Sequence, residues 1–251
     1  MGVMVVTGSA SGIGRATAAR LAESGHQVIG VDIREADVVA DLSRAAGRRA
    51  MVEQVIARAP NGVHGVLAAA GVSALDHPGL TLGLNYFGAV ATLEGLRPHM
   101  VQGARAVAVG STSALLPTDD VTVCACLAGD EDAAIAAAEA RPEATYMSSK
   151  RALSLWLRRT AVSPSWAGSG VLLNGVAPGV VETAMTAPLL KDPAMRDLIA
   201  QTNPMAVEDF AEPGEIAELI AYLLTFKGHY LLGQMIFIDG GTDALMRPDA
   251  F

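Results

Sequence analysis

The chain has 251 residues, a formal net charge of −8, 51% apolar residues and only 4% aromatic residues. This length suffices for one α/β domain with a large core, and an aliphatic composition is typical of a parallel sheet covered by helices. The acidic balance argues against a nucleic-acid partner or an anionic membrane surface, which need clustered lysine and arginine. No apolar run approaches the roughly 18 residues that span a bilayer, and no secretory signal fits, so a cytoplasmic protein is expected.

Metal-binding and disulfide patterns are weak in this sequence. The two cysteines, Cys124 and Cys126, form a lone C-x-C, and the five histidines are scattered without ligand spacing. Neither a zinc site nor a disulfide framework fits such a pattern. We therefore interpret both cysteines as small apolar residues and predict no metal.

Short apolar runs alternate with helical patterns along the chain. Strands are expected over residues 3–6, 27–31, 63–68, 105–109, 171–176 and 235–238. Helices are expected between them, over residues 12–24, 43–59, 79–101, 145–166 and 213–226. This alternation predicts an α/β fold with a Rossmann-type doubly wound parallel sheet, helices on both faces and a single domain over residues 1–251.

Two segments interrupt this rhythm. Residues 115–141 contain a loop with Pro117, Asp119 and Asp120, followed by an alanine-rich helical run over residues 131–140, and are predicted to form a helical insertion. Residues 180–210 are punctuated by proline, carry methionine and leucine, and show no strand pattern. Long excursions at the ends of parallel strands are often binding elements, so the second segment is predicted to be a substrate lid.

The stretch TGSASGIG, Thr7–Gly14, lies between the first strand and the first helix. Glycines there allow close backbone approach, and a helix N-terminus favours anions, so the stretch predicts a phosphate cradle. Its G-x-x-x-G-x-G spacing does not match G-x-G-x-x-G literally, and such loops can be plain tight turns. Asp32, at the end of the second strand, strengthens the prediction because its carboxylate can accept hydrogen bonds from ribose hydroxyls.

Asp32 also bears on the choice of cofactor. Its negative charge would repel a 2′-phosphate, which favours NAD over NADP, whereas Arg15 and Arg34 could support the opposite choice. A solvated carboxylate without function is the simpler alternative.

The segment YMSSK places Tyr146 and Lys150 one helical turn apart, on the same face. Tyrosine is a poor base because its ordinary pKa is about 10, and a nearby ammonium can lower it. The pair is therefore a candidate general acid/base for a ketone or alcohol oxygen. A Y-x-x-x-K pattern also arises by chance on exposed helices, so the pair alone decides little.

The combination of motifs resembles the short-chain dehydrogenase/reductase family. TGSASGIG, Asp32, LNYFGA around Asn85, GSTS at Gly110–Ser113, YMSSK, APGVVET and IDGG follow one another in that order across almost the whole chain. Within the family, the stretches DIREADVVADLS and IDGGTDALMRP and the late insertion resemble bacterial 3α-hydroxysteroid dehydrogenases with carbonyl reductase activity.

This resemblance implies a role for each matching residue. Tyr146 would exchange the proton, Lys150 would lower its pKa and hold the nicotinamide ribose, and Ser111 would bind the substrate oxygen, with Ser113 as the alternative. Asn85 would kink its helix and hold a water that links Lys150 to solvent. NAD(H) would be bound by Gly8, Ser9, Ala10, Ser11, Gly12, Ile13, Gly14, Asp32, Ile33, Asp41, Leu42, Gly71, Tyr146, Lys150, Pro178, Gly179, Val181 and Thr183. Of these, Asp41 and Leu42 would flank the adenine.

Two departures from the family pattern matter. Ala68-Ala69-Ala70-Gly71 stands where the family has Asn-Asn-Ala-Gly, so one polar support near the adenosine is missing. Ser111 and Tyr146 lie 35 positions apart, about three times the family's usual spacing, so the insertion must fold outside the sheet. Beside the two long helices it would block the family's four-helix bundle, so we expect a homodimer that forms through another surface.

The expected partner is a small hydrophobic ketone or alcohol, with a steroid favoured. Ser111, Tyr146, Met185 and Leu189 are the predicted substrate contacts, because the apolar lid suits a bulky ligand. A plain amphipathic helix packed on the core is the alternative interpretation of that segment. Two functional alternatives also stay open: the same chemistry on another secondary alcohol, ketone or 3-oxoacyl thioester, and a non-catalytic NAD(H)-binding sensor.

Overall fold

The computed structural model describes residues 1–250. Within them, seven strands form one parallel sheet in the order β3-β2-β1-β4-β5-β6-β7. The strands are β1 Val3–Thr7, β2 Gln27–Asp32, β3 Val38–Val39, β4 Val63–Ala68, β5 Met100–Val109, β6 Leu172–Pro178 and β7 Met235–Ile238. The predicted doubly wound α/β fold is confirmed, and β3 is an additional edge strand of two residues.

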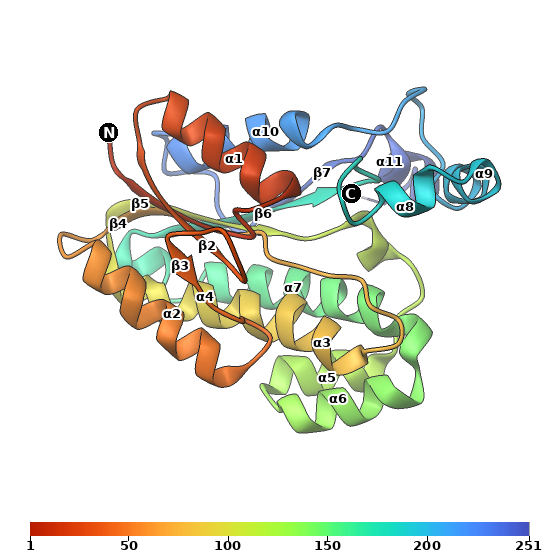
Figure 1. Ribbon diagram of the computed structural model, residues 1–251, viewed down its shortest axis with the longest axis horizontal. Helices are drawn as coiled ribbons and strands as arrows, with labels where there is room; N and C mark the ends of the chain where they lie inside the picture. Colours follow the sequence, from red (N-terminus) through yellow and green to blue (C-terminus); the bar gives the residue numbers. More distant parts are fainter. Residues whose placement is uncertain (251) are drawn as a thin grey trace.

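Helices cover both faces of the sheet (Figure 1). On one face lie α1 Gly12–Glu23 and α10 Pro213–Thr225, and on the other lie α2 Ala45–Arg58, α4 Ala89–Leu96 and α7 Thr145–Ala161. Four further helices are α3 Pro78–Leu82, α8 Ala187–Leu190, α9 Pro193–Thr202 and α11 Thr242–Met246, and two more helices belong to the insertion described below. Among residues 1–250, no helix is both long and apolar enough to cross a membrane.

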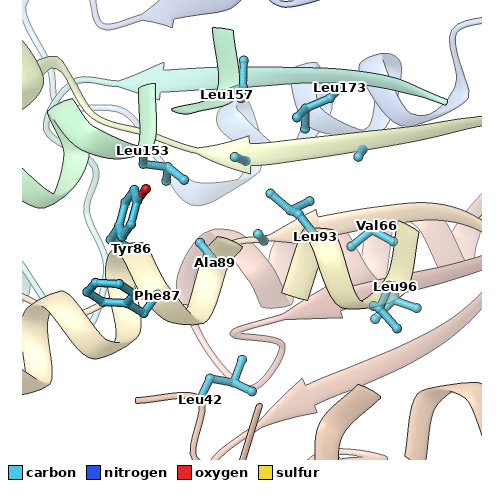
Figure 2. Packing of buried hydrophobic residues seen from close by; sticks show 14 of the residues in the cluster. Leu42, Val66, Tyr86, Phe87, Ala89, Leu93, Leu96, Leu153, Leu157 and Leu173 are labelled. Carbon is cyan, nitrogen blue, oxygen red and sulfur yellow. The ribbon is translucent and has the colours of Figure 1, made fainter. Parts of the chain in front are cut away.

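Successive residues of each buried strand point to opposite faces of the sheet and pack into two separate hydrophobic cores. On β1, Val5 faces the α2, α4 and α7 side, whereas Met4 and Val6 face α1 and α10. Figure 2 shows the first core, where Leu93 of α4 lies near Val66 of β4 and Leu153 of α7 lies near Tyr86. Burial of aliphatic side chains on both faces explains why the strands are continuous apolar runs rather than alternating ones.

The insertion forms two helices outside the sheet. Residues 115–141 contain a loop, then α5 Asp120–Ala128 and α6 Glu131–Ala140, which pack against each other, with α5 on α7 and α6 on α3 (Figure 1). The expected helix over residues 131–140 is present, but part of the expected loop is helical. The side chain of Asp119 accepts a hydrogen bond from Thr122 N at 2.8 Å, which caps α5.

The predicted helix over residues 79–101 is interrupted. It consists of α3, a π-helical turn over Gly83–Gly88, α4 and a 3₁₀ turn over Arg97–His99, and β5 begins at Met100. The π turn brings backbone from another segment very close: a methyl group on Gly83 would lie 2.6 Å from Ser43 O. Single π turns inside α-helices often mark functional sites, and this one contains Asn85.

Candidate active site

The predicted site residues collect at the carboxyl edge of the sheet. Chain order reverses between β1 and its neighbour β4, and a ligand crevice of an open α/β sheet forms outside the strand ends at such a point. Thr7, Asp32, Ala68, Val109 and Pro178 are the last residues of β1, β2, β4, β5 and β6. Every predicted catalytic or nucleotide-binding motif follows one of these ends or packs beside it.

The glycine-rich loop after β1 needs its glycines for conformation and for space. Gly8 and Gly12 have φ values of +71° and +50°, a region that side chains disfavour. A methyl group on Gly14 would lie 2.2 Å from Gly8 O, so only glycine lets α1 begin this close to the loop. Because α1 begins at Gly12, the loop leads directly into free backbone N–H groups at a helix N-terminus, which suits a phosphate.

Asp32 is tied to this loop. Its Oδ2 accepts a hydrogen bond from Ala10 N at 3.0 Å, and its Oδ1 accepts one from Ile33 N at 2.7 Å. The half-buried carboxylate therefore has a fixed orientation and retains acceptor capacity for ribose hydroxyls. Arg15 and Arg34, the residues that could favour a 2′-phosphate, are both exposed.

The segment after β6 closes the other side of the cradle. A methyl group on Gly12 would lie 3.3 Å from Thr183 Cγ2, so the two loops are neighbours. Gly179 N donates a hydrogen bond to Ile238 O at 3.1 Å, and the buried Val181 pairs with Ala211. Of the predicted cofactor residues of this segment, Thr183 thus lies beside Gly12 of the glycine-rich loop.

Thr7 has a structural role that the sequence motif did not reveal. Its hydroxyl accepts hydrogen bonds from Ala69 N at 3.0 Å and Ala70 N at 3.1 Å. The backbone after β4 is therefore held against the end of β1 although the family's asparagine is missing from this turn. Close approach is preserved as well, because a methyl group on Gly8 would lie 3.0 Å from Ala70 N.

Three predicted catalytic side chains meet between β5 and α7. Tyr146 is half-buried, Ser111 and Lys150 are buried, and the hydroxyl of Ser111, which accepts a hydrogen bond from Ser113 N at 3.1 Å, lies near the phenol of Tyr146. Lys150 Nζ donates to Val109 O at 2.9 Å and lies 5.8 Å from the centre of the Tyr146 ring. The insertion does not separate these groups, because it folds outward between Ser111 and Tyr146 as expected.

Burial governs the acid/base properties of this pair. It raises the pKa of Tyr146 above its ordinary value, and the nearby Ser111 hydroxyl lowers that pKa by a smaller amount. Burial also lowers the pKa of Lys150 to about 8. The predicted lowering of the phenol pKa by Lys150 is therefore not seen in the protein alone: loss of water acts more strongly on both groups than their mutual interaction.

Asn85 connects the π turn to the loop after β4. Its amide group donates to Val72 O and accepts from Val72 N, both at 2.8 Å, and also donates to Ser149 Oγ at 3.4 Å. A methyl group on Gly71 would lie 3.1 Å from Asn85 Oδ1 and 3.7 Å from Lys150 Nζ. Asn85, Gly71 and Lys150 are therefore immediate neighbours, and the expected distortion of the helix at Asn85 is a π turn.

The predicted lid is exposed and apolar. Met185 and Leu189 are 43% and 46% exposed, and α9 has no buried residue among those described. Proline divides the segment as predicted, with Pro193 at the start of α9. The alternative of an amphipathic helix packed on the core stays open, because Leu190 is buried and Met195 and Ile199 of α9 are half-buried.

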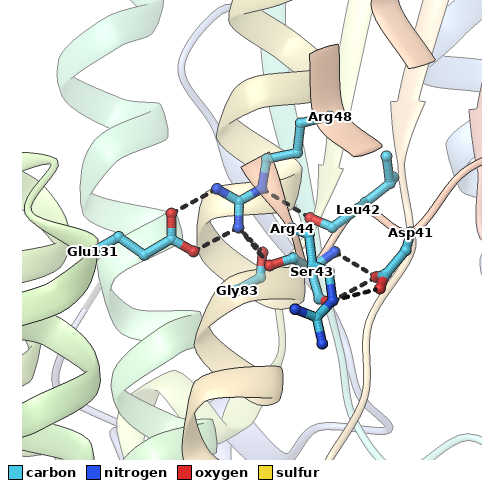
Figure 3. Close-up of polar contacts among 7 residues, drawn as sticks. All are labelled: Asp41, Leu42, Ser43, Arg44, Arg48, Gly83 and Glu131. Carbon is cyan, nitrogen blue, oxygen red and sulfur yellow. Dashed lines mark hydrogen bonds and ion pairs between the residues drawn. The ribbon is translucent and has the colours of Figure 1, made fainter. Parts of the chain in front are cut away.

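The predicted adenosine segment is anchored by residues that were not predicted. Asp41 Oδ1 accepts from Ser43 N and Ser43 Oγ, and these bonds hold the pKa of Asp41 below its ordinary value. Leu42 O accepts from the buried Arg48, which also forms an ion pair with Glu131 of the insertion (Figure 3). This pair spans 83 positions, so no local sequence signal could have indicated it.

No cluster of three or more histidine, cysteine, aspartate or glutamate side chains suited to a metal ion occurs in residues 1–250. Both cysteines are free thiols there. Cys126 is buried, which raises its pKa to about 12, whereas Cys124 is exposed. Neither thiol contributes to the strand-end crevice.

Comparison with known families and proteins agrees with this geometry. Residues 2–126 match the family model described as short chain dehydrogenase, and residues 132–243 match the model described as Enoyl-(Acyl carrier protein) reductase. The chain is 38% identical to a 3-alpha-hydroxysteroid dehydrogenase/carbonyl reductase of Comamonas testosteroni, and the match covers 100% of both chains. It is 31% identical to a cis-4-hydroxycyclohexanecarboxylate dehydrogenase of Sinomonas cyclohexanicum, over 97% of both chains.

A solved structure is similar over the whole length. The 3-alpha-hydroxysteroid dehydrogenase from Pseudomonas sp. B-0831, complexed with NADH, has 41% sequence identity and a TM-score of 0.92, and the match covers 99% of this chain and 100% of that one.

Proposed function

Because the chain belongs to the short-chain dehydrogenase/reductase family, we propose that it is an NAD(H)-dependent oxidoreductase that interconverts 3α-hydroxysteroids and 3-ketosteroids, with broader carbonyl reductase activity. The observation that carries the proposal is the contact between Ser111 and Tyr146 beside Lys150, at the strand-end crevice of a chain with full-length similarity to such enzymes. Neither a dinucleotide sensor nor a structural protein requires that arrangement.

The crevice fits a dinucleotide. Gly8 and Gly12 leave room at the start of α1, where backbone N–H groups would bind the pyrophosphate. Asp32 would accept hydrogen bonds from the adenosine ribose and repel a 2′-phosphate, which supports NAD over NADP. When bound, the nicotinamide supplies a hydride acceptor in one direction and a hydride donor in the other.

The residues of this chain would handle the proton and the substrate oxygen. In the oxidative direction, Tyr146 in its deprotonated form would accept the hydroxyl proton of a secondary alcohol, and bound NAD⁺ would serve as the acceptor of the carbon-bound hydride, so that the products would be a ketone, NADH and one proton. Ser111 would donate a hydrogen bond to the substrate oxygen and fix its position. Lys150, whose pKa burial lowers to about 8, would stabilise the deprotonated phenol and bind the nicotinamide ribose.

Exposed apolar side chains next to the crevice favour a bulky apolar substrate. Met185 and Leu189 lie in the segment that follows Thr183, and Leu198 of α9 is 50% exposed. Flexible apolar side chains of this kind can cover a hydrophobic ligand and exclude water from hydride transfer. Two relatives named for ring alcohols, a hydroxysteroid and a hydroxycyclohexanecarboxylate, support the choice of a cyclic secondary alcohol.

The proposal is tested by NADH formation measured with three substrates: androsterone, a panel of simple secondary alcohols, and a 3-hydroxyacyl thioester. We expect the highest kcat/KM with androsterone and a strong preference for NAD⁺ over NADP⁺. A preference for the thioester or a simple alcohol would keep the enzyme class and overturn the steroid assignment. Cofactor binding without turnover of any substrate would support the sensor alternative instead.

A further inference from the structure

Arg48 of α2 is a buried cation whose guanidinium contacts three separate segments. It is 7% exposed. Its Nε donates to Leu42 O at 2.8 Å, and one terminal nitrogen donates to Ser43 O at 2.8 Å and Gly83 O at 2.9 Å. Figure 3 shows these bonds converging on one side chain. Arg48 thereby joins the segment after β3 to the π turn.

The third contact is with the insertion. Both terminal nitrogens of Arg48 donate to the carboxylate of Glu131, at 2.7 and 2.6 Å, in a bidentate pair. Glu131 is the first residue of α6, and its side chain is 30% exposed. Planar bidentate pairs fix orientation as well as distance, which a lysine in place of Arg48 could not do.

The segments that Arg48 joins are packed without spare room. A methyl group on Gly88 would lie 2.9 Å from Leu42 O, and one on Gly47 would lie 2.0 Å from Asp41 O. With backbone in direct contact, a shift of the π turn is transmitted to the loop over residues 41–43. Asn85, two residues after Gly83 in the same π helix, is hydrogen-bonded to the backbone of Val72.

A buried ion pair is weak evidence for stability, because an apolar replacement is often as stable. What Arg48 supplies is geometry: five hydrogen bonds directed at three backbone carbonyls and one carboxylate. No other segment among the described residues links the insertion to the loop over residues 41–43 through an ion pair.

We infer that the Arg48–Glu131 pair is a positioning device through which α6 of the insertion holds the loop over residues 41–43 in the conformation that receives the adenosine half of the dinucleotide. This inference rests on the proposed function, because it concerns NAD(H) binding. Neither residue would touch the ligand. The insertion then contributes to cofactor affinity at a distance, in addition to covering α7.

The test compares Glu131→Gln with Asp132→Asn. Both substitutions remove one negative charge from the first turn of α6, but the exposed Asp132 does not contact Arg48. Calorimetry would give the Kd for NADH and for ADP-ribose, which lacks the nicotinamide. We expect Glu131→Gln to raise both Kd values by about fivefold to tenfold, and Asp132→Asn to change them by less than about twofold.

Hydrogen–deuterium exchange of the protein without ligand gives a second readout. Backbone amides of residues 41–47 and 83–88 should exchange faster in Glu131→Gln than in Asp132→Asn, because the guanidinium loses its charged partner. Arg48→Lys should show the same pattern more strongly, and Glu131→Gln remains informative where Arg48→Lys fails to fold.

The outcomes separate the two proposals. If the wild-type protein binds NADH and Glu131→Gln matches it in both Kd values and in exchange, the positioning role is overturned while the proposed function stands. If the wild-type protein binds neither NADH nor ADP-ribose, the proposed function fails and the positioning role fails with it.

Discussion

The floor of the predicted cofactor crevice and the predicted lid over residues 180–210 are built in opposite ways. On the floor, Ser111, Lys150 and Asn85 are buried, and each is hydrogen-bonded to backbone. In the lid, Met185 and Leu189 are exposed and apolar, with no hydrogen bond to orient them. A preorganised floor suits chemistry that is common to a family, and an adaptable lid suits the choice of substrate. Substitutions on the floor should therefore change turnover, and substitutions in the lid should change substrate preference.

The largest expected effect is that of Tyr146→Phe. Removal of the phenolic oxygen eliminates the proton acceptor, so kcat should fall by about three orders of magnitude or more, while the Kd for NADH stays within about threefold. Tyr230→Phe is the matched control, because Tyr230 is 92% exposed. Steady-state kinetics and calorimetry measure both effects. Full activity of Tyr146→Phe would place the acid/base elsewhere.

Lys150→Met tests how much the buried ammonium of Lys150 lowers the free energy of unfolding. Burial lowers the pKa of Lys150 from 10.5 to about 8, so between pH 8 and 10.5 the unfolded chain binds more protons and the wild-type free energy of unfolding rises with pH. Below pH 8 the buried ammonium costs stability. Lys150→Met should therefore unfold at higher denaturant concentration at pH 7, by roughly 1–3 kcal/mol, and lose that rise with pH.

The activity of Lys150→Met should move the other way, with a loss of at least about a hundredfold in kcat/KM. Chemical denaturation at several pH values supplies the stability measurement. A parallel pH dependence in the two proteins would show that Lys150 keeps its ordinary pKa.

Asp32→Asn tests whether the negative charge of Asp32, rather than its hydrogen bond to the glycine-rich loop, sets the preference for NAD⁺ over NADP⁺. An asparagine can still accept the hydrogen bond from Ala10 N but no longer repels a phosphate. The preference for NAD⁺ over NADP⁺, measured as a ratio of kcat/KM values, should fall by about tenfold or more. An unchanged ratio would assign cofactor choice to other residues.

A substitution in the predicted lid should change substrate preference without changing turnover of small substrates. Leu189→Ser should raise KM for androsterone by about fivefold to tenfold and leave the kcat/KM of a small ketone within about twofold. Val162→Ser serves as the control, because Val162 is 66% exposed and follows the opposite end of α7 from Tyr146. An equal effect on both substrates would remove the distinction between lid and floor.

The last prediction concerns the oligomeric state of the unmodified protein. Because α5 and α6 pack beside α7 and α3, we predict a homodimer whose interface excludes the α4 and α7 surfaces. Native mass spectrometry and crosslinking should give a dimer without α4–α7 crosslinks. A tetramer joined through those helices would contradict the prediction.

Local patterns predicted most of the fold and the floor. Strand ends, the glycine-rich loop and the Tyr146–Lys150 spacing depend on neighbouring residues, so the sequence alone indicates them. The edge strand β3 was missed because two residues show no periodicity. Helix α5 was missed although Asp119 is a helix-capping residue, because proline and two aspartates suggested a loop.

Features that depend on distant contacts could not be predicted in this way. The π turn at Asn85 arises where its amide binds Val72 and where backbone from residues 42–43 packs on its glycines. The Arg48–Glu131 pair joins two helices 83 positions apart. The prediction that the pKa of Tyr146 is lowered differs from the structure because burial, which the sequence does not show, raises that pKa.

The most direct test of the central claim is transfer of deuterium to a 3-ketosteroid from NADH that carries deuterium at both C4 positions of the nicotinamide. We predict that the purified protein forms the 3α-alcohol with deuterium at C3, and that Tyr146→Phe binds the labelled cofactor without forming it. Unchanged ketone in the presence of bound NADH, or an alcohol free of deuterium, would contradict the account.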